Sequence, residues 1–583
     1  MPAADAVGHA NYSSHLMATT ERQIALLHDR SALEASLAAA ADAVANPDQY
    51  GAVFTRRWVV DLILDLVGYT SDRDLASMLA LEPACGTGAF LGPMVERLAE
   101  SCEKHGHPIT DARDAIYAGD LQPGNVAVSR TLVESVLVGL GHAPGMCLEL
   151  AEAWVHHDDF LLSEHRDAVA DFAVGNPPYI RLEDVSPARS AAYRSACPTM
   201  GGRADVFVGF FEVALKSLKA GGVLGFICAD RWMRNNYGQK LRQLVADEFA
   251  VDTTIEMHQV DAFDAEVDAY PSVTIIRNGE QGEALVANAR PSFGATSAQR
   301  IRSWAKAEQL TQDQDFHAAR LPSWFSGQTS WPTGSPERLS LLADLERRLP
   351  TLEAEDPTTK VGIGVATGAD KVFVVKDANL VEENRMLAMT MAKDTMSGVL
   401  DWSGSFLVNP WSNEGKGLVD LADYPRLAEY YEQHAAALLG RNVANRRPAQ
   451  WYRTIDRVDH TLTPRVKLLF PDIKASIHPV MDEGGLYPHH NLYYVVSDAW
   501  DPQVLGGLLL SRVAQLFVEA YAVRMRGGCL RFQAQYLRRI RVPKRETVNA
   551  TAARELREAF DSRDVERATR IALDLYGVSH LPE

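Results

Sequence analysis

Between about residues 53 and 277, short apolar runs alternate with segments of helical periodicity, and this alternation constrains the fold more than any other feature. We expect strands at residues 78–81, 115–118, 171–174, 223–228 and 273–276, and helices at 58–67, 89–104, 206–218 and 239–249. Strands that alternate with helices form βαβ units and a mostly parallel sheet. The predicted fold class is therefore α/β and Rossmann-like, with ligands bound beyond the carboxyl ends of the strands.

The sequence predicts three parts. Residues 1–48 form an N-terminal helical segment, because Leu and Ile recur at helical spacing between residues 20 and 45. The α/β pattern predicts a catalytic domain over residues 49–290. After about Gly279, Gly, Pro, Trp and Ser become frequent, which indicates a linker. Residues 291–583 then comprise this linker and a second domain of mixed α+β structure.

The composition is that of a soluble globular protein, and we expect a cytoplasmic location. No apolar stretch approaches the roughly 18 residues of a membrane helix. The first residues lack a secretory pattern. The 6 cysteines are scattered without a CxxC pair, so the sequence predicts neither a disulfide framework nor a metal site.

The segment LEPACGTGAF, residues 81–90, follows the first predicted strand and opens a helix. Its glycines let a ligand approach the backbone closely, and the helix N-terminus offers free N–H groups. The segment lacks the GxGxxG pattern, which indicates a cofactor without a pyrophosphate. Asp120 ends the second strand, where an acid accepts hydrogen bonds from ribose hydroxyls. Asp159 and Phe160 follow a third apolar segment and offer an acceptor and a ring for an adenine base.

The sharpest motif is Asn176, Pro177, Pro178 and Tyr179, which follows the strand at 171–174. The prolines fix the backbone and present carbonyl oxygens where other residues would present N–H groups. The Asn176 side chain adds a second carbonyl. Two acceptors that hold both hydrogens of a conjugated amino group would direct its lone pair toward a methyl donor, while Tyr179 offers a flat ring for stacking.

Taken in order, these motifs resemble the gamma-class, TaqI-like adenine-N6 DNA methyltransferases of restriction–modification and phage-defence systems. The resemblance covers nearly all of the chain after Gly51 and implies S-adenosylmethionine as cofactor. It implies that the methionine and ribose portions are lined by Thr55, Glu82, Ala84, Cys85, Gly86 and Gly88. It further implies that Asp120 holds the ribose, that Asp159 and Phe160 hold the adenine, and that residues 176–179 are catalytic. Arg56 and Arg57 stand where the family has prolines after the threonine.

The resemblance also implies a second ring that stacks on the target base. Phe263 is our choice, and Tyr270 remains the alternative because the spacing to the strand at 273–276 differs from the family pattern. The segment around Asp205 resembles the helix start that follows the catalytic loop in these enzymes.

The C-terminal half resembles the family's target-recognition region, through residues 361–373 (VGIGVATGADKVF) and the tripeptide at 451–453 (WYR). Basic residues concentrate at 441–467 and 512–545, although the net charge is −18, so a local basic face predicts contacts with double-stranded DNA. The target adenine would be flipped into the catalytic pocket. The sequence holds no PD-(D/E)xK nuclease pattern, and we expect modification without cleavage; a cognate restriction endonuclease or phage-defence proteins are possible partners.

Three alternatives remain open at this stage. Glutamine-amide methyltransferases that act on release factors share the Asn-Pro-Pro-Tyr loop, but they are much shorter. Ribosomal RNA methyltransferases are a second alternative. The third is a non-catalytic specificity subunit of a defence complex, which the intact motifs disfavour.

Overall fold

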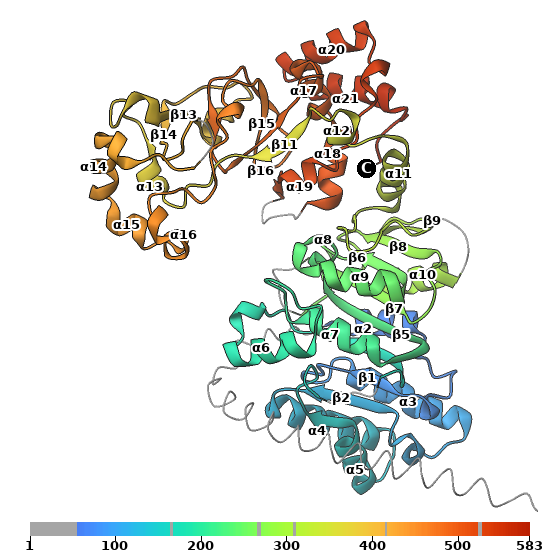
Figure 1. Ribbon diagram of the computed structural model, residues 1–583. Helices are drawn as coiled ribbons and strands as arrows, with labels where there is room; N and C mark the ends of the chain where they lie inside the picture. The colour runs from blue at the N-terminus through green and yellow to red at the C-terminus, as the bar shows by residue number, and fades with distance from the viewer. Residues whose placement is uncertain are drawn as a thin grey trace, which may run out of the picture. The chain divides into compact units, whose positions relative to one another are not determined.

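The computed structural model describes residues 55–163, 167–264, 270–306, 311–413, 417–522 and 528–582. The chain divides into two compact units, with the division between Ser330 and Trp331. The predicted N-terminal helical segment, residues 1–48, lies outside the described residues. Each unit has its own hydrophobic core. In Figure 1 the described residues of the first unit run from blue to green, and those of the second run from yellow-green to red.

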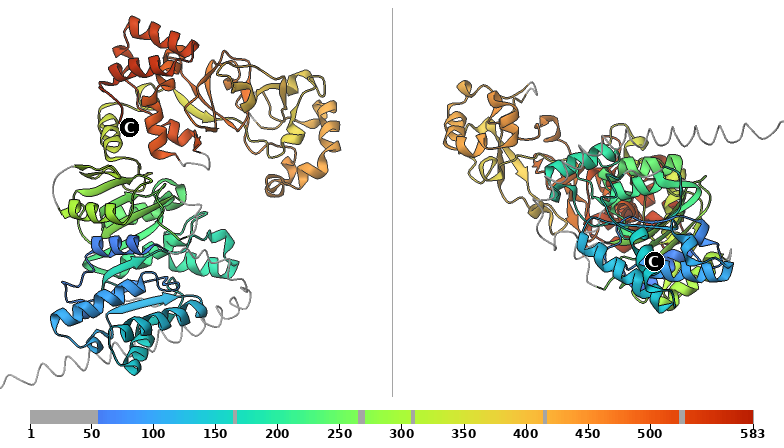
Figure 2. Two further views of the ribbon diagram at one scale, coloured as in Figure 1. Left: turned by 180° about the vertical axis from the view of Figure 1, so that it is seen from behind. Right: turned by 90° about the horizontal axis from the view of Figure 1, so that it is seen from below.

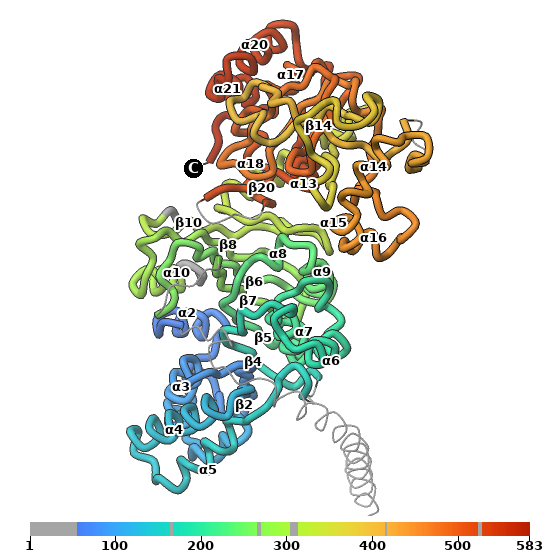
Figure 3. The backbone as a smooth tube through the Cα atoms, turned by 90° about the vertical axis from the view of Figure 1, so that its left-hand side faces the viewer, coloured from blue at the N-terminus to red at the C-terminus, as the bar shows by residue number. Residues whose placement is uncertain are grey.

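A ten-stranded sheet forms the centre of the first unit. Its order is β3 (Val155–His157), β2 (Ile116–Asp120), β1 (Ala80–Glu82), β4 (Ala170–Gly175), β5 (Leu218–Ala229), β7 (Pro271–Arg277), β6 (Ala250–Glu256), β8 (Ala284–Ala289), β10 (Phe316–Leu321) and β9 (Thr311–Gln312). In Figure 3 this order rises from β2 to β10. Strands β3 to β5 in this order are parallel, whereas β7 is antiparallel to both β5 and β6. The sequence therefore predicts the α/β class correctly, and each predicted strand overlaps an observed one.

The strand order reverses between β1 and β4, and this reversal positions the functional site. Consecutive strands on either side of such a switch point send their connections to opposite faces, which opens a crevice at the carboxyl ends. Leu81 pairs with Ala173, so β1 and β4 end side by side. The turn after Glu82 and the loop after Gly175 therefore begin next to each other.

Helices cover both faces of this sheet. They are α2 (Arg57–Val67), α3 (Leu91–His105), α4 (Pro123–Gly139), α5 (Pro144–Trp154), α6 (Pro187–Ala196), α7 (Phe207–Ser217), α8 (Arg231–Arg234), α9 (Gln239–Glu248) and α10 (Ala295–Lys306). Successive residues of β5 show that α2 and α7 lie on opposite faces. A Cβ atom at Gly225 would lie 2.5 Å from Val67 of α2, whereas the Phe226 ring packs on Phe211 of α7. The view from behind in Figure 2 accordingly shows α2, in blue, in front of the sheet.

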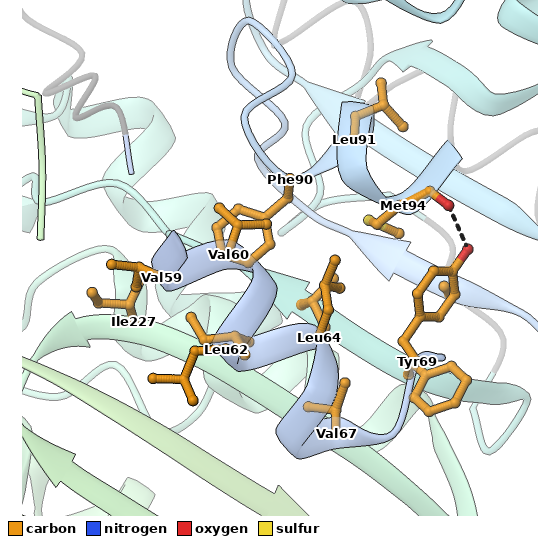
Figure 4. Packing of buried hydrophobic residues seen from close by; sticks show 14 of the residues in the cluster. Val59, Val60, Leu62, Leu64, Val67, Tyr69, Phe90, Leu91, Met94 and Ile227 are labelled. Carbon is orange, nitrogen blue, oxygen red and sulfur yellow. Dashed lines mark hydrogen bonds between the residues drawn. The ribbon is translucent and has the colours of Figure 1, made fainter. Parts of the chain in front are cut away.

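Helix α2 joins the sheet to α3 through an apolar stripe. Its buried residues Val59, Val60, Leu62, Ile63, Leu64 and Val67 recur at helical spacing, and each contributes roughly 1.5–3 kcal/mol on burial. Figure 4 shows several of them against Phe90, Leu91 and Met94. Gly68 ends the helix in the left-handed region at φ 79°. The Tyr69 hydroxyl then donates a hydrogen bond to the Met94 carbonyl at 3.2 Å, which fixes α3 against this end.

The first unit extends past residue 290, the boundary expected from composition. Strand β8 pairs in parallel with β6, and β10 pairs antiparallel with β8, so both complete the same sheet. Backbone hydrogen bonding across the sheet thus decides the boundary, and the residues rich in Trp, Pro and Gly around Trp331 mark the change of unit.

The second unit is mixed α+β, as predicted. One sheet has the order β11 (Lys360–Ile363), β19 (Leu492–Val496), β15 (Lys467–Pro471) and β17 (Val480–Asp482). Another has the order β12 (Val374–Val375), β14 (Ser405–Val408), β13 (Met386–Thr390) and β18 (Tyr487–Pro488). A two-stranded sheet pairs β16 (Ile473–Lys474) with β20 (Leu530–Arg531). The principal helices are α11 (Pro336–Arg348), α14 (Pro425–Gln433), α17 (Pro502–Leu510), α18 (Arg512–Tyr521), α20 (Ala550–Asp561) and α21 (Val565–Tyr576).

Within the described ranges, no single helix has the length and apolar character needed to cross a membrane. Helices α17 and α18 meet those criteria only as a pair, and they meet at a bend of 62°. Their apolar residues are buried in the core of the second unit.

Candidate active site

A cavity of about 190 Å³ opens at the carboxyl ends of β1, β2, β3 and β4. Most of the residues predicted for the site line this cavity: Thr55, Glu82, Ala84, Cys85, Gly86, Asp120, Asp159, Phe160, Asn176, Pro178 and Tyr179. Three other predicted site residues, Gly88, Pro177 and Phe263, are not among the described lining residues. The cavity lies where the reversal of strand order predicts a ligand site.

Two buried acids dominate the end of the cavity next to β1 and β2. Glu82 is 1% exposed, and its Oε2 atom has no hydrogen-bond partner among the described residues. Burial, and secondarily the charge of Asp120, raises the pKa of Glu82 well above its usual value. Burial likewise raises the pKa of Asp120, against hydrogen bonds that favour its ionised form. Such acids are suited to bind a ligand that brings its own donors.

The Asp120 carboxylate is held by three donors. Its Oδ2 accepts from the Gly86 N–H at 2.9 Å, while Oδ1 accepts from the Gln122 N–H at 2.8 Å and from Asn125 Nδ2 at 3.1 Å. These bonds connect the turn after β1 to the loop after β2. Gly86 has φ 53°, and a Cβ atom there would point into open space, so this glycine leaves room for a ligand against the backbone.

Gly88, unlike Gly86, faces a neighbouring helix and not open space. Its φ is 93°, and a Cβ atom would lie 2.4 Å from Leu132 Cδ2 of α4. The absence of a side chain lets α4 pack closely on the turn. The geometry thus gives Gly88 a packing role behind the cavity wall.

Asp159 and Phe160 line the other end of the cavity. Asp159 Oδ2 accepts a hydrogen bond from the Tyr193 hydroxyl at 2.9 Å and lies 3.8 Å from Arg189 Nε. Burial raises the pKa of Asp159, whereas the Tyr193 hydrogen bond and the Arg189 charge oppose that rise. The Phe160 ring stacks on Phe210, with centroids 5.6 Å apart. Sequence reasoning missed Arg189 and Tyr193, and it predicted no helix over these residues; their spacing of four residues, which fits one face of a helix, was the only available signal.

The loop of residues 176–179 is connected to two distant segments through Thr55. Asn176 Nδ2 donates to Thr55 Oγ1 at 3.2 Å. Thr55 forms an antiparallel bridge with Phe263, and the Arg56 N–H donates to the Ala262 carbonyl at 3.0 Å. The chain therefore brings Thr55, Asn176 and Phe263 together although they are far apart in sequence.

Tyr179 lies between two other aromatic rings. Its centroid is 6.4 Å from that of Phe207 and 6.5 Å from that of Phe263, whose plane is nearly perpendicular. The Tyr179 hydroxyl is buried and has no hydrogen-bond partner among the described residues; burial raises its pKa well above the usual value. Tyr270 instead packs on His258, with centroids 5.0 Å apart. Of the two candidate rings, Phe263 is the one in contact with Tyr179.

A buried charged cluster follows the ends of β5 and β6. His258 Nε2 lies 2.7 Å from Asp230 Oδ2, and its Nδ1 lies 3.0 Å from Glu256 Oε1. Burial lowers the pKa of His258, but these two acids raise it to about 9. Arg234 contacts both oxygens of Asp230 at 2.7 Å. Sequence analysis overlooked this cluster, whose signal was a concentration of charged residues directly after apolar strands.

In the second unit, most of the basic residues expected to meet a polyanion have internal partners. Arg441 donates to the Thr367 and Trp451 carbonyls. Lys467 and Asp482 form a fully buried pair at 2.9 Å. By contrast, Arg446, Arg447 and Arg457 are exposed and make no ion pair with the described residues. Within residues 441–467, these three are the basic side chains that are both exposed and without an ion pair among the described residues.

The sequence is similar to those of known methyltransferases. Residues 149–263 match the family described as Eco57I restriction-modification methylase. The chain is 44% identical to the type II methyltransferase M.PaeR7I of Pseudomonas aeruginosa, over 91% of this chain and 92% of that protein. It is 41% identical to the type II methyltransferase M.XhoI of Xanthomonas vasicola, over 91% and 98% of the two chains.

Among solved structures, the type IIL restriction-modification enzyme MmeI in complex with DNA is similar in fold. The TM-score is 0.54 at 11% identity, with 90% of this chain and 74% of that chain covered. The sheet order and the turn between β1 and α3 define a Rossmann-like α/β fold, and the relatives named above make it that of a methyltransferase. On the similarity of its sequence over nearly the full length of its relatives, the chain belongs to the type II methyltransferases of restriction–modification systems.

Proposed function

We propose that this protein is a site-specific methyltransferase that transfers a methyl group from S-adenosylmethionine to the N6 amino group of adenine in duplex DNA, without cleaving the DNA. The observation that carries the proposal is the loop Asn176–Tyr179 at the carboxyl end of β4, on the wall of an acid-lined cavity. In a restriction–modification pair, this methylation would protect DNA from a cognate endonuclease.

The residues of the cavity fit the proposed cofactor. The buried Glu82 Oε2 atom can accept from the ammonium group, and Asp120 can accept from the ribose hydroxyls. Gly86 leaves space for the cofactor against the backbone, while Asp159 and Phe160 are suited to an adenine at the other end. When bound, S-adenosylmethionine supplies an electrophilic methyl group on a sulfonium.

The chain's own contribution to the chemistry is orientation. Asn176 Oδ1 and the Pro177 carbonyl accept hydrogen bonds from the two hydrogens of the target amino group, so its lone pair points toward the methyl donor. Thr55 accepts from Asn176 Nδ2 and so fixes which way the amide faces. These acceptors act most strongly as positive charge develops on the nitrogen, which is the condition for catalysis. Tyr179 and Phe263 provide rings for an extrahelical base.

Duplex DNA as the substrate is supported by the relatives, which are restriction–modification methyltransferases, and by the DNA complex of MmeI. Arg446, Arg447 and Arg457 in the first basic cluster, and Lys544 and Arg545 in the second, are exposed candidates for phosphate contacts. Neutralising one that contacts a phosphate should reduce the slope of binding against salt concentration by about one. Glutamine substitutions at all five that leave both affinity and slope unchanged would place the phosphate-binding surface elsewhere.

The decisive test identifies the methylated base. The purified chain is incubated with labelled S-adenosylmethionine and unmethylated plasmid DNA, and the nucleosides are separated by mass spectrometry. N6-methyladenine is the expected base, and methylation-aware sequencing of the same plasmid should locate it at one recurring sequence; Asn176→Ala serves as the strongly impaired control. Label on cytosine, or label taken up by ribosomal RNA or by a release-factor glutamine in parallel incubations, would overturn the substrate assignment.

A further inference from the structure

The segment that follows the catalytic loop leaves the sheet and returns to its starting point. Leu182 N–H donates to the Ala204 carbonyl at 2.9 Å, and Val206 N–H donates to the Ile180 carbonyl at 2.8 Å. Arg181 and Asp205 pair antiparallel. Between these closing contacts lies α6, which is next to α7 in Figures 1 and 3. The segment between these contacts therefore starts one residue after Tyr179, and it places helix α6 next to the cofactor cavity.

Two residues of α6 form part of the cavity wall. Arg189 and Tyr193 are four residues apart, hence on one helix face, and both are buried at 9% and 5% exposure. The Tyr193 hydroxyl donates to Asp159 Oδ2, and the Arg189 guanidinium lies against the same oxygen. On the same helix, Arg194 points elsewhere and donates to the Met200 and Gly202 carbonyls.

Charge around the cavity makes Arg189 distinctive. The described residues that line it include five acids: Glu82, Asp120, Asp158, Asp159 and Asp184. Arg189 is the only basic side chain among the described lining residues. Arg189, Tyr193, Asp158 and Cys197 all interact electrostatically with Asp159. Burial and the neighbouring acid favour protonation of Asp159, so Arg189 supplies the opposing positive charge.

We propose that Arg189 and Tyr193 are positioning residues that keep Asp159 ionised and oriented as the acceptor for the 6-amino group of the cofactor's adenine. This inference rests on the proposed cofactor. A carboxylate has about four acceptor positions, so the Tyr193 hydrogen bond leaves others for the amino group. A protonated Asp159 would present an O–H donor to a group that is itself a donor, and the adenine would lose its partner.

The test is calorimetry of S-adenosylhomocysteine binding across mildly acidic to mildly alkaline pH, for the wild type and for Arg189→Gln, Arg189→Lys and Tyr193→Phe. Arg189→Gln should weaken binding about tenfold at neutral pH. As the pH is lowered, the affinity of Arg189→Gln should begin to fall at a higher pH than that of the wild type, because Asp159 is protonated at a higher pH in this variant. Arg189→Lys should retain most of the affinity, since it keeps the charge. Arg194→Gln is the matched control on the same helix and should bind as the wild type does.

A second ligand separates positioning from general structural damage. S-inosylhomocysteine carries an oxygen in place of the 6-amino group, so its affinity should be nearly the same in the wild type and in Arg189→Gln. Equal losses for both ligands, or a pH profile unchanged by Arg189→Gln, would overturn the inference while leaving the cofactor assignment intact. Failure of the wild-type protein to bind S-adenosylhomocysteine at all would instead overturn the proposed cofactor.

Discussion

Thr55 and Asn176 allow a quantitative test of how the site orients the Asn176 side-chain carbonyl, the proposed acceptor for the target amino group. Asn176→Ala removes one preorganised hydrogen-bonding group, a loss that typically costs about 2.7–4 kcal/mol of transition-state stabilisation, or roughly 10²–10³ in rate. Thr55→Val removes only the 3.2 Å hydrogen bond to Asn176 Nδ2. A neutral hydrogen bond of this kind contributes about 0.5–1.5 kcal/mol, so methylation should slow by roughly 2- to 10-fold.

The double variant Thr55→Val with Asn176→Ala tests whether Thr55 acts through Asn176. Because Thr55 acts through the Asn176 amide, Thr55→Val should have no further effect once Asn176 is alanine. The coupling energy of the cycle should then equal the whole effect of Thr55→Val. Single-turnover rates of methyl transfer to duplex DNA, at saturating cofactor, measure the chemical step directly.

Calorimetry with S-adenosylhomocysteine supplies the control. If Thr55 works through Asn176, its substitution by valine leaves cofactor affinity nearly unchanged; if it binds the methionine carboxylate, as the family resemblance implies, affinity falls. Additive effects of the two substitutions on rate would refute orientation of Asn176 by Thr55. Near-native methylation by Asn176→Ala would refute the acceptor mechanism altogether.

Three further outcomes are expected. Asp120→Asn should weaken S-adenosylhomocysteine binding by about 1.5–3 kcal/mol, the scale of charged hydrogen bonds, and calorimetry that finds native affinity would contradict the role of this carboxylate. Lys467→Met should destabilise the second unit by about 3–5 kcal/mol because Asp482 is left buried and uncompensated; chemical denaturation measures this, and Lys467→Met with Asp482→Asn should recover part of the loss. The pKa of His258 is raised to about 9, so its stabilising contribution is complete below the unfolded value of about 6.5 and is lost as pH rises to 9. Thermal melts should therefore show stability declining over that window, and His258→Gln should flatten the decline, whereas an unchanged pH dependence would show that His258 is not protonated in the fold.

Local pattern was sufficient for the α/β class and for the motifs at strand ends. Apolar runs between helical segments determine the parallel sheet, and parallel strands end at one edge, so Glu82, Asp120, Asp159 and Asn176 had to lie near each other. Each of these residues lies at the end of a strand or within two residues after it, and all four line the cavity. The roles assigned to them remain predictions that the experiments above address.

Long-range contacts decided what the sequence left open. Phe263 lies with Tyr179 because it pairs with Thr55 across the fold, whereas Tyr270 packs on His258. The internal partners of Arg441 and Lys467 exclude side chains that composition alone made candidates for DNA contact. Residue type and spacing predict the local backbone conformation and the positions of the strand ends. Packing between segments far apart in the chain places Arg189 against Asp159 and determines which strand ends the sheet. Only the tertiary structure contains that information.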